Sequence, residues 1–87
     1  MGGLVMYYWD LYFADGGEVM QYGAEFPSIK AAVKHAKNFI NHTLDYYTKG
    51  TEVNIKISDI PQEVRAAGDV MIEDFIYEET YFKRTGR

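Results

Sequence analysis

The 87-residue sequence predicts an α+β fold: an antiparallel sheet of three to four strands with one long helix packed on it. Three observations predict this class: an alternating strand pattern with a tight turn near the N-terminus, an amphipathic helical pattern in the middle, and a second alternating pattern after it. The expected order is ββαβ followed by a C-terminal helix or strand. The length fits one domain, residues 1–87.

A β-hairpin is expected first. Residues 5–13 alternate with a period of two in residue types that favour strands, and Asp15-Gly16-Gly17 suits a tight turn. The return strand is expected from Glu18 to Glu25 or Phe26. One face of the first strand, expected to meet the helix, carries Tyr7, Trp9 and Leu11, and the other face carries Tyr8, Asp10 and Tyr12.

A helix is expected next, from Ile29 to about Tyr47, with Ser28 as its N-cap and Lys49-Gly50 at its end. Apolar residues spaced by three or four positions give it one stripe for packing on the sheet: Ile29, Val33, Ala36, Ile40, Leu44 and Tyr47. One flank beside this stripe carries Lys30, Lys34, Lys37 and Asn41. The simplest interpretation of these lysines is a solvated face.

Residues 52–58 predict a third strand, with Val53, Ile55 and Ile57 facing inward. Two interpretations of the segment after Pro61 stay open. In the favoured one a helix continues to about Lys83, because the Glu and Asp content suits a helix. In the other, the helix ends at Ala67 and a fourth strand runs from residue 70 to about residue 82, because Ile, Tyr, Thr and Phe favour strands.

Composition excludes several classes of function. There is no cysteine, which removes disulfides and thiolate chemistry and suits a reducing compartment, so we expect a cytoplasmic protein. No apolar run has the length of a membrane span, and the first residues lack the pattern of a signal peptide. The net charge of −4 argues against a dedicated nucleic-acid binder, since such proteins neutralise phosphates with basic side chains.

No constellation of residues predicts catalysis, a metal site or a cofactor. His35 and His42 are seven positions apart, whereas helical metal pairs are three or four apart. The Asp15-Gly16-Gly17 segment lacks the rest of a phosphate loop. We therefore expect a non-enzymatic protein without a cofactor or bound metal.

Two groups of residues are candidates for binding a partner. Tyr8, Asp10 and Tyr12 form an interface if they are exposed, or a second layer of core if the C-terminal segment covers them. The acidic pairs Glu73-Asp74 and Glu78-Glu79 form a docking patch for a basic partner, or simply a solvated acidic face. The 16% content of aromatic residues favours an interface, because it exceeds what so small a core needs.

Residues 7–58 resemble small ββαβ proteins of uncharacterised bacterial and phage families, including small acidic anti-CRISPR proteins. The resemblance lies in the strand YYWDLYF, the DGG turn, the lead-in GAEFPS, the helix IKAAVKHAKNFI and the strand VNIKI. It implies a non-catalytic inhibitor that binds and blocks a host protein complex. Two alternatives remain: a homo-oligomeric structural or accessory domain, such as a homodimer, and, with less support, a nucleic-acid-binding protein.

Overall fold

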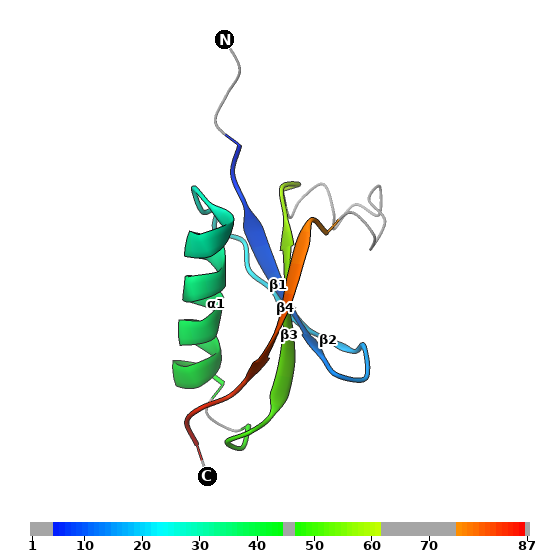
Figure 1. The fold of residues 1–87 in the computed structure, drawn as a ribbon, viewed down its shortest axis with the longest axis vertical. Coiled ribbons are helices and arrows are strands. Elements are labelled where there is room, and N and C mark those ends of the chain that lie inside the picture. The colour runs from blue at the N-terminus through cyan, green and yellow to red at the C-terminus, as the bar shows by residue number, and fades with distance from the viewer. Residues whose placement is uncertain (1–4, 45–46, 62–74, 87) are drawn as a thin grey trace.

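The computed structural model describes residues 5–44, 47–61 and 75–86 (Figure 1). Its elements are β1 (Tyr8–Phe13), β2 (Glu18–Gln21), α1 (Ile29–His42), β3 (Glu52–Ser58) and β4 (Tyr77–Phe82). The four strands form one antiparallel sheet in the order β2-β1-β3-β4. Helix α1 lies along one face of this sheet (Figure 1), which confirms the predicted α+β fold.

The β1–β2 hairpin is present but shorter than expected. Gly16 takes a φ of 94°, a conformation that glycine adopts without strain, and the Asp15 carboxylate accepts the amide of Gly17 at 2.8 Å. The first strand starts at Tyr8 rather than at the expected Val5, and the return strand ends at Gln21 rather than at the expected Glu25 or Phe26. Past β2 the chain leaves the sheet, and a single bridge between Tyr7 and Phe26 rejoins it to the start of β1.

Helix α1 begins as predicted and ends earlier. The hydroxyl of Ser28 accepts the amide of Ala31 at 3.0 Å, which satisfies one of the donors left unpaired at a helix start. The helix stops at His42 with Thr43 as its C-cap, rather than near Tyr47. Leu44 lies beyond this end yet is buried in the core, so the apolar periodicity outlasts the helix and misplaces its predicted end.

The core lies between α1 and the sheet. Trp9 and Leu11 of β1 and Val53, Ile55 and Ile57 of β3 face the helix and are buried, as predicted. They pack against four buried residues of α1: Ala32, Val33, Ala36 and Ile40. Burying this many aliphatic and aromatic side chains supplies most of the stability of a domain this small, at roughly 25 cal/mol per Å² of apolar surface.

The preference for a helix continuing to Lys83 is wrong, because residues 77–82 form strand β4. Each residue of β4 pairs with β3, from Tyr77 opposite Ile57 to Phe82 opposite Glu52. This pairing alternates the side chains between the two faces and turns Tyr81 into the core. The competing prediction placed the strand start at residue 70; residues 62–74 lie outside the described part of the chain.

Candidate functional site

The outer face of the sheet, opposite α1, carries the first group of predicted binding residues. Tyr8, Asp10 and Tyr12 are 7%, 0% and 9% exposed, so they belong to a second buried layer. Lys56 lies 4.7 Å from the ring centre of Tyr12, within the range of a cation–π contact. Burial, followed by the charge of Glu18, raises the pKa of the Tyr12 phenol. These side chains offer little surface to a partner.

The acidic residues of β4 do not form one patch. Neighbouring residues of a strand point to opposite faces, so Glu79 lies on the α1 side and Glu78 on the outer side. The Glu79 carboxylate is 2.5 Å from Lys37, and the Glu78 carboxylate is 3.8 Å from Lys56. Each acid is therefore beside a lysine of this chain. The other predicted acidic pair, Glu73-Asp74, lies outside the described residues.

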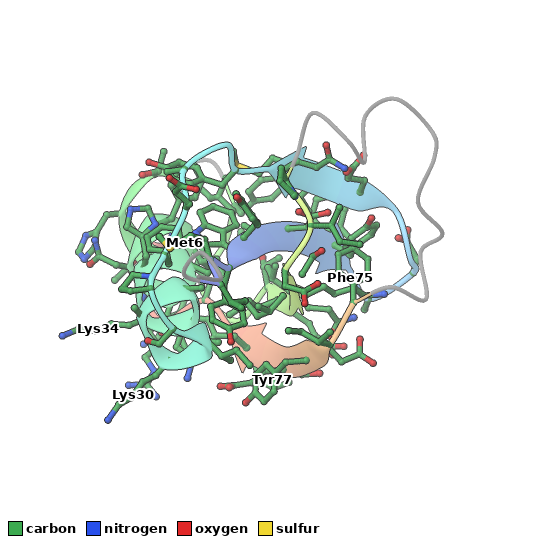
Figure 2. The ribbon with its side chains drawn as sticks, turned by 90° about the horizontal axis from the view of Figure 1, so that it is seen from above. Met6, Lys30, Lys34, Phe75 and Tyr77 are labelled. Carbon is green, nitrogen blue, oxygen red and sulfur yellow. The ribbon has the colours of Figure 1, made fainter. Side chains whose placement is uncertain are left out.

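A groove separates α1 from β4, and we take it as the candidate site. The helix packs mainly on β1 and β3. On the helix-facing side of β4, Tyr81 is buried while Tyr77 stays exposed. The groove has a volume of about 600 Å³. Its lining residues come only from these two elements: Ile29, Lys30, Val33, Lys34, Lys37, Tyr77 and Glu79. In Figure 2, Lys30 and Lys34 project from the helix and Tyr77 stands at the β4 margin of the sheet.

The groove combines an apolar floor with a basic rim. Ile29, Val33 and Tyr77 supply carbon surface, while three lysines follow the helix at spacings of four and three residues and so share one flank. Lys37 is paired with Glu79. Among the described residues, no carboxylate lies within ion-pair distance of Lys30 or Lys34. Their charges are therefore free to meet an external anion.

Glu79 is held in place inside the groove by two contacts. Besides its ion pair with Lys37, it accepts a hydrogen bond from the Tyr77 hydroxyl at 2.8 Å. The contact with Lys37, and then that with Tyr77, lowers the pKa of the Glu79 carboxyl below its ordinary value. The same hydrogen bond raises the pKa of the Tyr77 phenol. The charges of Lys37 and Glu79 thus cancel where α1 meets β4. The net positive charge of the groove comes from Lys30 and Lys34.

Strand β4 is also an open edge of the sheet. Among the described strands it pairs with β3 alone, on one side, since the sheet order ends with it. Ile76, Tyr77 and Phe82 on or beside this strand are 49%, 40% and 54% exposed, and they make up most of the large exposed apolar side chains among the described residues. An unpaired edge with exposed aromatic side chains is a template for strand addition by another chain.

A polar cluster closes the other end of the α1–β4 interface. The Asn41 side chain donates to the Tyr81 hydroxyl at 2.7 Å and accepts the amide of Arg84 at 2.9 Å. The Lys83 ammonium, almost fully buried, donates to the Asn41 carbonyl at 3.3 Å and to the Thr85 hydroxyl at 3.0 Å. We call Asn41, Tyr81, Lys83, Arg84 and Thr85 the strap. It fixes the end of β4 to the C-terminal turn of α1, where a cation is favoured.

Sequence reasoning identified the lysine flank but assigned it to solvent, and it did not identify Tyr77. The signal available was the position of Lys30, Lys34 and Lys37 directly beside the apolar stripe. The lysine spacing alone does not indicate that β4 lies next to this flank, because the position of β4 depends on its pairing with β3.

Other kinds of site receive no support from the described part of the chain. Within it, no three His, Asp or Glu side chains are grouped so that they could hold a metal ion. No helix in the described ranges is long and apolar enough to cross a membrane. The chain matches no protein-family model, no curated protein and no solved structure.

Proposed function

We propose that this chain is a non-catalytic protein-interaction module that binds its partner at the α1–β4 groove and along the open β4 edge. The observation that carries the proposal is the meeting of three features at one place: a strand that ends the described sheet, exposed aromatic side chains, and a rim with two lysines that have no ion-pair partner in the described part of the chain. An exposed sheet edge can accept an extended segment of another chain through main-chain hydrogen bonds, and neighbouring side chains then select which segment binds.

The proposed binding surface differs in part from the one expected from sequence. Tyr8, Asp10 and Tyr12 are buried and Glu78 lies on the outer face beside Lys56, whereas Glu79 lines the groove. This supports placing the proposed contact on the helix-facing side of the sheet. In the specific form suggested by the phage-family resemblance, the module acts in the cytoplasm and blocks a host protein complex by occupying one of its surfaces.

A capture experiment with matched variants tests this function. The protein is immobilised and exposed to a lysate, and bound proteins are quantified by mass spectrometry for wild type, Lys34→Glu and Lys49→Glu. Lys49 is exposed and lies away from the groove, so its reversal changes net charge equally without touching the site. A partner that is lost with Lys34→Glu and retained with Lys49→Glu supports the proposal. Partners that respond equally to both variants, or to neither, contradict it.

The open β4 edge also supports a second candidate, a homodimer in which two copies of β4 pair antiparallel. Thr80 is central in the strand, so a two-fold axis beside it would align Glu78 of one copy with Phe82 of the other. Light scattering of the purified protein over a range of concentrations distinguishes the two candidates. A mass of one chain at all concentrations excludes this dimer.

A further inference from the structure

We propose that the ligand of this site is an extended acidic peptide segment that adds to β4 as a fifth strand and directs alternate acidic side chains to Lys30 and Lys34. This inference rests on the proposed function, because it names the class of partner for the same groove.

The backbone of β4 is arranged to accept a further strand. The Lys83 amide donates to the Thr51 carbonyl at 2.9 Å, in the same register that pairs Phe82 with Glu52. Alternate residues of an antiparallel strand bond to alternate sides. Odd-numbered positions of β4 therefore bond toward β3, and the amide and carbonyl groups of Glu78, Thr80 and Phe82 face the open edge.

The charges of the rim select an acidic strand. Side chains of an added strand that point to the α1 side stand next to Tyr77 and Glu79 and below the helix flank that carries the lysines. Lys37 is already paired with Glu79, so the unmatched charges there are those of Lys30 and Lys34. Acidic side chains at alternate positions of the ligand match these two charges.

The other face of the added strand meets different chemistry. Phe82, 54% exposed, lies on the outer face of β4 beside Thr80, so ligand side chains on that side gain from being apolar. The favoured ligand consequently alternates acidic and apolar residues with a period of two. A second copy of β4 fits less well, because on the α1 side its sole acid, Glu79, is already held by Lys37.

The test uses a synthetic fluorescein-labelled peptide of alternating Glu and Val, with a Lys-and-Val peptide of equal length as its control. Binding to the full chain is followed by fluorescence polarisation at low and high salt. We expect the Glu peptide to bind, the Lys peptide not to bind, and Lys30→Glu with Lys34→Glu to weaken binding by about tenfold or more, since two charge contacts are reversed. Equal binding of the two peptides overturns the proposal.

Strand addition has its own pair of variants. Glu78→Pro removes an amide that faces the open edge, and proline is accepted at such positions of edge strands. Glu78→Ala removes the same carboxylate and keeps the amide. We expect Glu78→Pro to weaken peptide binding by about tenfold and Glu78→Ala by less than about twofold, because the lost backbone bond and the added ring act only on an added strand. Equal affinities of the two variants overturn the fifth-strand geometry.

A modified ligand gives the same answer without altering the protein, should Glu78→Pro unfold. Glu-Val peptides carrying N-methyl groups on every second amide block hydrogen bonding along one edge of the peptide. One of the two alternating N-methyl patterns faces β4 and should abolish binding, while the other should leave it intact. If both N-methylated peptides still bind, strand addition is ruled out. If no acidic peptide binds and a protein partner sensitive to Lys34→Glu is still captured, the ligand class is wrong and the proposed function stands.

Discussion

The two flanks of α1 meet the same sheet in opposite ways. On the β2 side, aromatic rings fill the space between helix and sheet: Trp9, Tyr22, Phe26, His35 and Phe39. Trp9 and Tyr22 stack with ring centres 4.6 Å apart and planes 6° from parallel. On the β4 side, a groove with a lysine rim takes the place of this packing. We call the ring-packed side the filled flank, although a smaller hollow lined in part by Phe26, Lys34 and His35 lies at its surface, and we call the β4 side the open flank.

The difference shows how one short helix can serve both stability and recognition. Two of these five rings, Tyr22 and Phe26, come from the chain that follows β2 and crosses to the helix, and they complete a cluster with Trp9 of β1 and two rings of α1. The β4 side has no such segment among the described residues. The two helix-facing positions of β4 that line the groove are an exposed tyrosine and an ion-paired glutamate, and the third, Tyr81, is buried in the core. The lysine stems beside them cover some apolar surface while their charges stay in water.

The largest expected effect compares one tyrosine from each flank. Tyr22→Ala should lower the free energy of unfolding by about 2–4 kcal/mol, because it empties a stacked, partly buried position against Trp9. Tyr77→Ala should cost less than about 0.5 kcal/mol, because Tyr77 is 40% exposed and packs little. Urea denaturation followed by circular dichroism measures both.

The binding of the acidic peptide should respond in the reverse order. Tyr77→Ala removes part of the groove wall and weakens binding, whereas Tyr22→Phe keeps the stacked ring and leaves both stability and binding close to wild type. If Tyr22→Ala and Tyr77→Ala destabilised the fold equally, the distinction between the two flanks would fail.

The next effect concerns the strap, which sets the end of the open flank. Asn41→Ala removes a side-chain donor to the Tyr81 hydroxyl and an acceptor for the Arg84 amide. We expect a loss of about 2 kcal/mol, near the sum of two net hydrogen bonds at about 1 kcal/mol each. Urea denaturation gives the value, and Asn38→Ala, on an exposed position of the same helix, is the control. A cost no larger than that of the control would show that the strap does not hold β4.

A smaller effect is expected from the polar contact within the filled flank. The Trp9 indole donates to His35 Nδ1 at 3.1 Å, and Trp9 is completely buried. His35→Leu keeps apolar volume and leaves this donor without its acceptor, which should cost about 1–2 kcal/mol. Lys34→Leu, the neighbouring position in the groove, should change stability by less than about 0.5 kcal/mol. Denaturation curves followed by the fluorescence of the single tryptophan compare the two variants. Similar losses of stability would contradict a stabilising role for the Trp9–His35 hydrogen bond.

The sequence predicts the framework well because that framework follows from local patterns. The alternation around Trp9 and Leu11, the glycine turn and the Ser28 cap each depend on neighbours a few residues apart, and all three are found in the structure. The end of α1 is predicted too late, since burial of Leu44 continues the apolar spacing after the helix has stopped.

Prediction is weakest where the result depends on residues far apart in the chain. Residues 77–82 have both helix-favouring acids and strand-favouring aromatics, and pairing with β3 decides between them. Because the groove requires β4 beside α1, its position could not be read from the lysine spacing alone. The burial of Tyr8 and Tyr12 likewise depends on what covers the outer face, a question that alternation in one strand leaves open.

The smallest predicted effect is the response of the open flank to acid. Contacts with Lys37 and Tyr77 lower the pKa of Glu79 below its ordinary value of 4.5, so the folded state favours the charged carboxylate. As pH falls, the unfolded chain takes up this proton first. The stabilisation is therefore complete above about pH 4.5 and is lost as the pH passes through the lowered pKa. For an ion pair this exposed, the whole contribution should be below about 1 kcal/mol.

The difference in the free energy of unfolding between wild type and Glu79→Gln isolates that contribution from those of the other titrating groups. Urea denaturation at pH 7, at pH 4.5 and at pH 3 should show wild type more stable than the variant at neutral pH and the gap closing in acid. Glu78→Gln is the matched control, since Glu78 lies on the outer face at 3.8 Å from Lys56. A gap that stays constant with pH would mean that Glu79 is not held by Lys37, and the groove would then carry three unpaired lysines in place of two.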